Sequence, residues 1–363
     1  MTTRPLGQAG ALDQWCDEWL SKDLDEWVSR IASLHLDAEG GSQYWLARAK
    51  ELGIGPGDIT CYADLEAFGP MPLDLLRSLD PAELVPASVP RPLSGQVWET
   101  GGTTGSPCRV FYTPRMLHHR GMWRMWSVAA DGFRPNRAWL QATPTGPHLI
   151  GNGSWEVSEL LGGRVYAIDM DPRWVKRLLR NGNLGAAQEY TEHLLDEIAA
   201  VLRTQDIDYL STTPALLRHL VRREPQLVAR LSGVRLSGTQ LTPAMRREFV
   251  DALDGGLCGG TYGNTFGNAA ALPPENEGEL LPYMPNYPQV TMNVVDPRGW
   301  RRQVPYGEMG QVSLTVLHED LFLPNILERD QAIRYDPGSG WPCDGVANVQ
   351  PLASARPALE GVY

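Results

Sequence analysis

The chain has 363 residues, of which 42% are hydrophobic and 21% charged, a composition ordinary for a globular protein with a substantial core. Its net charge of −11 argues against a nucleic-acid-binding surface, which usually carries a basic excess, although backbone N–H groups can still bind a phosphate locally. No run of about 18 apolar residues occurs, which argues against a membrane span. The five cysteines are widely spaced without a CxxC pair, and the first residues lack the apolar core of a signal peptide. We therefore expect a cytoplasmic protein with free thiols.

Residues 1–95 are predicted to form a helical leader. Apolar residues that include Trp15, Trp19 and Trp27 recur at three- and four-residue steps, which predicts one amphipathic helix over 11–36 with its tryptophans in the core. A second helix is expected over 42–53, ending near Gly53. Residues 68–95 are rich in proline and predict an irregular crossing segment.

Between residues 96 and 255, short apolar runs alternate with helical patterns, which predicts an α/β core with largely parallel sheets. Strands are expected near 97–98, 109–112, 139–140, 164–168, 209–210 and 234–236. Helices are expected at about 115–130, 154–162, 172–180, 186–204, 214–230 and 243–253. Residues 256–363 are richer in proline and glycine, and strands at 290–295 and 310–317 predict a more antiparallel subdomain. We predict that these three subregions form a single domain.

A loop rich in glycine and threonine follows the first predicted strand. Residues 99–107 read Glu-Thr-Gly-Gly-Thr-Thr-Gly-Ser-Pro, so the loop presents consecutive backbone N–H groups and hydroxyl donors, as a polyphosphate requires. It lacks the G-x-x-x-x-G-K-[ST] pattern of a Walker A motif. A flexible turn without a ligand is the alternative. The residues assigned to phosphate binding are Thr100, Gly102, Thr103, Thr104 and Gly105.

This loop resembles the phosphate-binding signature of the adenylate-forming superfamily, which includes acyl-CoA synthetases, peptide-synthetase adenylation domains and luciferases. Its continuation, residues 107–113, is most similar to the phenylacetate–CoA ligase branch. The resemblance implies the large N-terminal domain of the adenylate-forming fold, with layered, mostly parallel sheets flanked by helices and an antiparallel C-terminal subdomain.

Four further segments resemble motifs of the superfamily in the same order: residues 144–151, 236–241, 260–265 and 307–330. In the first, His148 matches a side chain that gates the carboxylate pocket. The resemblance implies that Tyr262 stacks on adenine, that Thr265 touches the α-phosphate and that Asp330 accepts the ribose hydroxyls; a carboxylate suits a cis-diol because it accepts two hydrogen bonds. The residues assigned to the nucleotide are Ser237, Gly238, Thr239, Thr261, Tyr262, Gly263 and Asp330. Those assigned to catalysis are Thr104, Thr265 and His148, and those assigned to the acid are His148, Trp155, Asn264, Gly267 and Asn268.

The sequence departs from the superfamily pattern in three places. It ends at Tyr363, about where the family's hinge begins, so the small mobile C-terminal domain and its catalytic lysine are expected to be absent; no lysine follows Lys176. Cys108 stands where many members have a lysine. Phe266 replaces the glutamate that helps to hold magnesium, and a phenylalanine cannot bind a hard cation. By motif position, Arg109 and Arg329 are the nearest cations that could act as substitutes.

The resemblance implies ATP-dependent activation of an aromatic carboxylic acid as an acyl-AMP, with release of pyrophosphate. The cofactors expected are ATP and Mg²⁺, with no residue assigned as a metal ligand, and the reaction is expected to be slow without the lysine. The length also resembles that of a truncated adenylating enzyme of phenazine-antibiotic biosynthesis. Small residues at 267–270 are expected to leave room for a flat ring.

Two alternatives remain at this point. The chain could be a ligase that passes the adenylate to an amine, nitrite or carrier thiol, or a non-catalytic module that binds an acyl group or nucleotide. The partners expected are a small aromatic carboxylate and an acceptor amine or alcohol or a partner protein, with a homodimer left open and neither nucleic acid nor membrane bound.

Overall fold

The N-terminal part of the chain is helical in the computed structural model, which describes residues 9–102 and 106–352. Its elements are α1 (Ala9–Leu20), α2 (Leu24–His35), α3 (Gln43–Leu52), η1 (Pro56–Asp58), η2 (Tyr62–Phe68), α4 (Leu75–Ser78) and η3 (Pro81–Leu84). The prediction of one helix over 11–36 is wrong, because the chain turns at 21–23 and Asp23 caps α2 by accepting a hydrogen bond from the Glu26 N–H at 3.0 Å. The helix predicted over 42–53 is confirmed and ends at Gly53 in the left-handed conformation.

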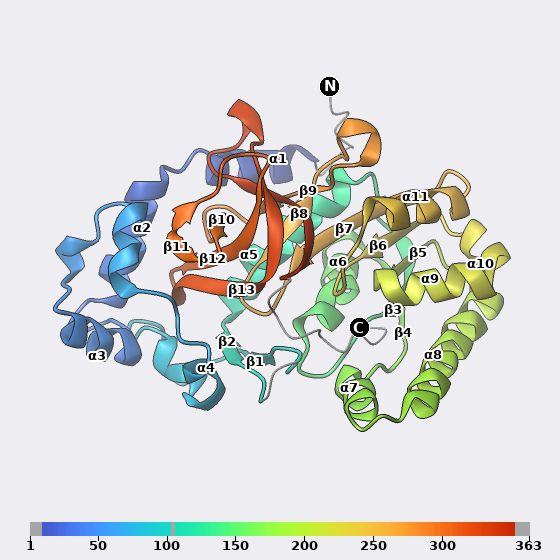
Figure 1. The fold of residues 1–363 in the computed structure, drawn as a ribbon, viewed down its shortest axis with the longest axis horizontal. Coiled ribbons are helices and arrows are strands. Elements are labelled where there is room, and N and C mark those ends of the chain that lie inside the picture. The colour runs from blue at the N-terminus through green and yellow to red at the C-terminus, as the bar shows by residue number, and fades with distance from the viewer. Residues whose placement is uncertain (1–8, 103–105, 353–363) are drawn as a thin grey trace.

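Twelve strands of the described residues form one mixed sheet, in the order β11-β10-β12-β13-β14-β9-β8-β7-β6-β5-β3-β4 (Figure 1). The parallel strands are β3 (Arg137–Ala142), β4 (Gly163–Ala167), β5 (Tyr209–Thr212), β6 (Gly233–Leu236) and β7 (Leu257–Gly263). The antiparallel strands are β8 (Asn268–Ala271), β9 (Pro282–Pro285), β10 (Val290–Asp296), β11 (Gly299–Gln303), β12 (Met309–His318), β13 (Leu321–Tyr335) and β14 (Gly345–Pro351). A separate hairpin pairs β1 (Gln96–Glu99) with β2 (Arg109–Tyr112) on either side of the glycine–threonine loop.

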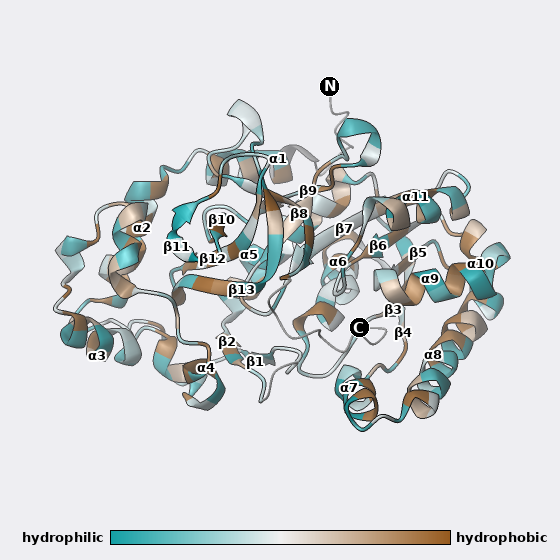
Figure 2. Ribbon diagram, viewed as in Figure 1, coloured by the Kyte–Doolittle hydropathy of each residue, from teal (hydrophilic) through white to brown (hydrophobic). Residues whose placement is uncertain are grey.

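Helices cover both faces of the parallel part. They are α5 (Pro114–Ala130), α6 (Gly153–Leu161), α7 (Pro172–Arg180), α8 (Leu184–Thr204), α9 (Pro214–Arg223), α10 (Pro225–Ala229) and α11 (Pro243–Ala252), with short turns η4 (Leu149–Asn152), η5 (Asn276–Gly278) and η6 (Gly338–Gly340) elsewhere. Residues of α8, α9 and α11 share one core with Leu140 and Leu210, whereas α5 and α6 pack against Trp139 and Tyr209. Alternate strand residues therefore face opposite helical layers. Figure 2 shows hydrophilic and hydrophobic residues alternating along α8 and α9, as expected for helices with one face on a core.

The helical leader packs against the antiparallel part of the sheet. Trp27 and Trp45 are buried there, and their indole N–H groups donate to the carbonyl oxygens of Leu317 (2.9 Å) and Phe322 (2.8 Å). These bonds confirm that the predicted tryptophan stripe serves packing at Trp27. No helix of the described ranges 9–102 and 106–352 is long and apolar enough to cross a membrane.

The predicted α/β class, with parallel strands followed by an antiparallel region, is confirmed. The predicted helix over 214–230 is two helices, because Pro225 starts α10 and cannot continue the hydrogen bonding of α9. The 15-residue strand β13 was not predicted, because two register shifts against β12 interrupt its alternation of apolar and polar residues. The boundaries of the three subregions stay a prediction.

Candidate functional site

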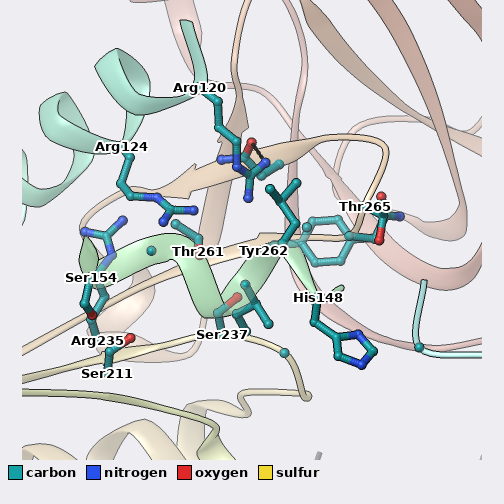
Figure 3. A pocket seen from close by; sticks show the side chains of 18 of the residues that line it. Arg120, Arg124, His148, Ser154, Ser211, Arg235, Ser237, Thr261, Tyr262 and Thr265 are labelled. Atoms are coloured by element: carbon teal, nitrogen blue, oxygen red, sulfur yellow. Dashed lines mark hydrogen bonds between the residues drawn. The ribbon is translucent and has the colours of Figure 1, made fainter. Parts of the chain in front are cut away.

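Five of the predicted motifs meet at one cavity of about 270 Å³. It lies where β5, β6 and β7 end, and the carboxyl ends of parallel strands are the usual place for a ligand in an α/β sheet. Figure 3 shows this cavity with Thr261 and Tyr262 at its centre. The predicted site residues that line it are Thr100, His148, Ser237, Gly238, Thr261, Tyr262, Gly263, Asn264, Thr265, Asn268 and Asp330.

Tyr262 and Asp330 line one end of the cavity, and a second carboxyl group, that of Glu328, lies close to Asp330. The Tyr262 hydroxyl donates to Asp330 Oδ2 at 2.9 Å, and Asn264 Nδ2 donates to Glu328 Oε1 at 2.6 Å. Burial, and then the charge of Asp330, raise the pKa of Glu328 to about 8, and burial also raises the pKa of Asp330. Most Glu328 is therefore protonated at pH 7.

The turn between β7 and β8 is stabilised by hydrogen bonds within the turn and by one hydrogen bond from β2. Asn264 Oδ1 accepts hydrogen bonds from the N–H groups of Phe266 (2.8 Å) and Gly267 (3.2 Å), and the Tyr112 hydroxyl donates to the Thr265 carbonyl at 2.9 Å. Thr265 Oγ1 in turn donates to the Glu99 carbonyl at 3.2 Å. These bonds place the turn directly against the start of the glycine–threonine loop.

The described part of that loop is anchored on β2. The Thr100 N–H donates to the Cys108 carbonyl and the Cys108 N–H to Thr100 Oγ1, both at 3.0 Å. The Cys108 side chain is buried, and burial raises the pKa of its thiol, so it is a packing residue rather than a nucleophile. The predicted phosphate-binding residues Thr103, Thr104 and Gly105 lie outside the described residues.

The helix α7 presents a line of cations to the loop. Lys176 Nζ donates to the Gly101 carbonyl at 3.4 Å, and Arg180 Nη2 donates to the Gly102 carbonyl at 3.0 Å. Arg173 pairs with Glu99, which also pairs with Arg109. Burial raises the pKa of Glu99, but the two arginines outweigh burial and leave the pKa lowered.

Sequence reasoning predicted this helix at 172–180 but missed that its cations face the loop. Arg109 and Arg329, the substitutes named from motif position, are not among the residues that line the cavity, whereas Lys176 is. The residues Arg173, Lys176 and Arg180 follow the i, i+3, i+7 spacing of one helix face, which was the signal available in the sequence. Burial, and then the nearby arginines, lower the pKa of Lys176 to about 8, so the ammonium form still predominates at pH 7.

His148 lines the cavity next to Pro147, whose carbonyl accepts a hydrogen bond from the Glu99 N–H at 2.9 Å. It is buried, and burial followed by the charges of Arg173 and Lys176 lowers its pKa to about 4, so the imidazole is neutral at pH 7. A neutral imidazole can approach a carboxylate or phosphate without acting as a further cation.

Gly151, three residues after His148, closes this wall by backbone contact. Its N–H donates to the His148 carbonyl at 3.0 Å, and a Cβ placed on Gly151 would lie 2.2 Å from the Pro144 carbonyl oxygen. We expect Gly151→Ala to lower the free energy of unfolding by about 2 kcal/mol, because the 144–151 loop must shift to admit the methyl group. Urea denaturation of the variant beside Gly57→Ala measures this; a Cβ at exposed Gly57 would meet nothing within 4 Å, and equal losses in both variants would contradict the prediction.

Four predicted site residues lie outside the lining of the cavity. Thr239 Oγ1 accepts a hydrogen bond from the Ala215 N–H at 3.4 Å, and Gly102 contributes its carbonyl to Arg180. Trp155 is 45% exposed. Close packing requires a glycine at position 267, because a Cβ there would lie 2.8 Å from Val290 Cγ1. Ala269 and Ala270 are buried in the core. Gly267, Ala269 and Ala270 therefore leave no room for a flat ring, whereas Asn268 lines the cavity.

Several cavity residues were not predicted and come from α5, α6, β5 and β6. They are Arg120, Arg124, Ser154, Ser211 and Arg235. Arg235 lies between two apolar strand residues that face α8, α9 and α11, so its side chain faces α5 instead. In Figure 3, Arg124, Ser154, Ser211 and Arg235 lie at the end of the cavity opposite His148 and Thr265.

The described residues form no cluster of three or more His, Cys, Asp or Glu side chains that could hold a metal ion. Phe266, at the position of the usual glutamate, is buried in the core, and Glu99 is bound by two arginines. The chain therefore offers no dedicated Mg²⁺ site among the residues that the structure describes.

Neither a protein-family model nor a curated protein sequence matches the chain. Solved structures do match it in fold. The chain is similar to 2-hydroxyisobutyryl-CoA ligase in complex with 2-HIB-AMP and CoA in the thioesterification state, with a TM-score of 0.64 and 15% identity over 96% of this chain and 69% of the ligase. An open conformation of that ligase, also with 2-HIB-AMP and CoA, gives a TM-score of 0.60 and 16% identity over 93% of this chain and 72% of the ligase. The fold of the chain is that of the adenylate-forming ligases.

Proposed function

We propose that this protein activates a carboxylic acid with ATP. A carboxylate oxygen attacks the α-phosphorus, the bond from that phosphorus to the bridging oxygen of the β-phosphate breaks, and pyrophosphate leaves, which yields an acyl adenylate. The observation that carries the proposal is that motifs spread from Thr100 to Asp330 line one cavity at the ends of the parallel strands. The fold shared with 2-hydroxyisobutyryl-CoA ligase, which was crystallised with an acyl-AMP, supports it.

In this proposal the nucleotide occupies the end of the cavity formed by the loop after β6 and by Tyr262. Ser237 and Gly238 contact the adenine, on which the Tyr262 ring stacks. Asp330 accepts the ribose hydroxyls, and the bond from the Tyr262 hydroxyl holds one of its oxygens in place. Thr265 and the glycine–threonine loop contact the phosphates.

The cations of α7 supply charge to the phosphates in the proposal. Lys176 and Arg180 already contact the two loop carbonyls, and a polyphosphate on the loop would lie within reach of both. A fixed cation stabilises the charge that develops at the α-phosphate during transfer. We propose that Lys176 is the cation that acts on the α-phosphate.

Magnesium enters the proposal as the metal of Mg·ATP. When bound, it neutralises phosphate charge. Because the described residues offer no dedicated site, its ligands would be phosphate oxygens and water.

A narrower proposal is that the acid is aromatic and that the adenylate serves the biosynthesis of a phenazine-type antibiotic. Trp139, which lines the cavity, supports an aromatic acid. The resemblance of the phosphate loop to the phenylacetate–CoA ligase branch supports it too. Transfer of the adenylate to an amine, nitrite or carrier thiol would follow the same first step.

Acid-dependent exchange of labelled pyrophosphate into ATP, with Mg²⁺ and a panel of aromatic and aliphatic acids, tests the activation step. We expect exchange with a limited set of acids, and a loss of about 10- to 100-fold in Asp330→Ala through a weaker affinity for ATP, because a charged acceptor of two hydrogen bonds is removed. Asp206→Ala, at an exposed carboxylate outside the cavity, is the matched control. Binding of ATP or acid without any exchange would favour a non-catalytic module, and no ATP binding would contradict the nucleotide site.

A further inference from the structure

Three arginines converge on the acid end of the cavity. Arg120 and Arg124 lie one turn apart on α5, and Arg235 reaches the same place from β6; we call these three residues the arginine cluster. Two small hydroxyl residues, Ser154 and Ser211, line the cavity beside them. Figure 3 shows Arg124, Arg235 and both serines on one side of Tyr262, with His148 and Thr265 on the other.

The cluster contains more positive charge than its neighbours balance. Arg124 Nη1 lies 3.0 Å from Glu156 Oε2, and Arg235 Nη1 lies 3.3 Å from Asp131 Oδ2. Arg120 forms no ion pair with any carboxylate of the described residues, and its Nη1 donates to the neutral Asn268 Oδ1 at 2.8 Å. Three cations therefore face two carboxylates.

This excess charge is held out of water. The side chains of Arg124 and Arg235 are only 11% and 9% exposed. Burial lowers the pKa of Arg120 and lowers that of Arg235 to about 10, and the charge of Arg124 acts on both in the same direction. Arginine side chains are not deprotonated in proteins, so the site holds a net positive charge at an energetic cost that a bound anion would offset.

The hydrogen bonding of the cluster is also incomplete. Among the described residues, the buried Arg120 Nε has no hydrogen-bond partner, and the buried Arg124 Nη1 lies 3.0 Å from Glu156 Oε2 without the geometry of a hydrogen bond. Gly153, at the start of α6, admits the Arg124 guanidinium, because a Cβ there would lie 2.5 Å from Arg124 Nη1. A guanidinium binds a carboxylate through two parallel N–H···O bonds, so the cluster has the chemistry of a carboxylate site.

We propose that the acid substrate is dianionic: one carboxylate is activated beside His148 and Thr265, and a second carboxylate binds to the arginine cluster. The inference rests on the proposed function, which it deepens by naming the substrate class. The phosphates of ATP do not need the cluster, because Lys176 and Arg180 serve them beside the loop. The reacting carboxylate must lie near those phosphates, which leaves the cluster for a different anionic group.

Binding of matched acids by isothermal titration calorimetry tests the proposal directly. Dicarboxylic acids of graded length, aliphatic and aromatic, are compared with their half-amides, which have the same shape but lack the second charge. We expect the best diacid to bind the wild type about 10- to 100-fold more tightly than its half-amide. Arg120→Gln is expected to abolish most of that preference while it changes the affinity for the half-amide by less than about threefold. The arginine lacks a carboxylate partner, so this substitution leaves no buried carboxylate unpaired.

Two further variants keep the outcome interpretable. Arg218→Gln removes an arginine of α9 that pairs with Glu248 outside the cavity, and it should keep the full preference for the diacid. The double variant Arg124→Gln/Glu156→Gln removes a buried cation together with its partner, and it should lose the preference while thermal melting shows a folded protein. Loss of preference in both cavity variants but not in Arg218→Gln supports the proposal.

Equal binding of diacids and half-amides by the wild type, or an equal loss of both in Arg120→Gln, would overturn it. Pyrophosphate exchange with the same acids tests the activation of the acid separately from the binding of a second carboxylate. Exchange with monocarboxylic acids alone would support acid activation but contradict the proposal that the substrate is dianionic. A charge-dependent preference in binding without exchange would support the arginine site and contradict the activation step.

Discussion

Replacing Lys176 with methionine is expected to lower acid-dependent pyrophosphate exchange by about 100-fold, with a much smaller change in the affinity for ATP. Methionine keeps the buried stem of the side chain and removes only the ammonium group that lies 3.4 Å from the Gly101 carbonyl. A fixed charge aimed at the α-phosphate stabilises the transition state more than the ground state, so the loss falls on kcat rather than on binding. Single-turnover exchange beside calorimetric ATP binding measures the two effects separately.

Two variants and a pH profile control this prediction. Lys176→Arg should retain about a tenth of the exchange or more, because it keeps the charge, and Lys50→Met, at an exposed position on α3, should retain all of it. Because the pKa of Lys176 is about 8, exchange should fall as the pH rises through 8 in the wild type but not in the arginine variant. Unchanged exchange in Lys176→Met would show that α7 contributes binding or stability only.

The free energy of unfolding is expected to fall by about 3 kcal/mol between pH 6.5 and pH 4 because of His35 alone. This residue is fully buried between α2 and the sheet, where its Nε2 donates to the His318 carbonyl at 3.1 Å and Ser42 Oγ lies 2.5 Å from Nδ1. Burial lowers its pKa from 6.5 to about 4. Between these values the unfolded chain binds a proton that the folded protein does not, so stability is complete above pH 6.5 and declines as the pH falls.

Urea denaturation at a series of pH values measures this decline. His35→Gln should be less stable at pH 7 but show a flatter profile between pH 6.5 and pH 4. His193→Gln, at a histidine whose side chain is 59% exposed, should leave the profile unchanged. Burial also lowers the pKa of His119 and of His318, and His119 Nδ1 lies 3.0 Å from His318 Nε2. Part of the slope should therefore persist in His35→Gln. Parallel profiles for His35→Gln and the wild type would contradict the assignment to His35.

Much of the lining of the cavity around Tyr262 could be predicted from sequence, because each of its motifs is local. The loop beginning at Thr100, the turn at Ser237 and the segment at Tyr262 each combine a strand end with glycines and hydroxyl residues over a few positions. Such short patterns can be recognised in a single sequence without knowledge of the fold. Only residues 103–105 of these motifs lie outside what the structure describes.

The acid end and the cationic helix could not be predicted in this way. Lys176 and Gly101 are 75 residues apart, and Arg235 and Asp131 are 104 apart, so neither contact leaves a local pattern. The prediction that small residues at 267–270 leave room for a flat ring failed for the same reason, because Gly267 packs against Val290, which is distant in the sequence.

By itself, the sequence determined the α/β class, the approximate positions of most strands and helices, and several motifs that line the cavity, because periodicity and turn chemistry are properties of short segments. The tertiary structure alone decided which cations reach the cavity and what the acid end contains. The pleat of β6 directs Arg235 toward α5, and the crossover through α7 brings Lys176 to the loop. Those contacts depend on the packing of whole helices against a sheet, and the free energy of that packing is distributed over residues far apart in the chain.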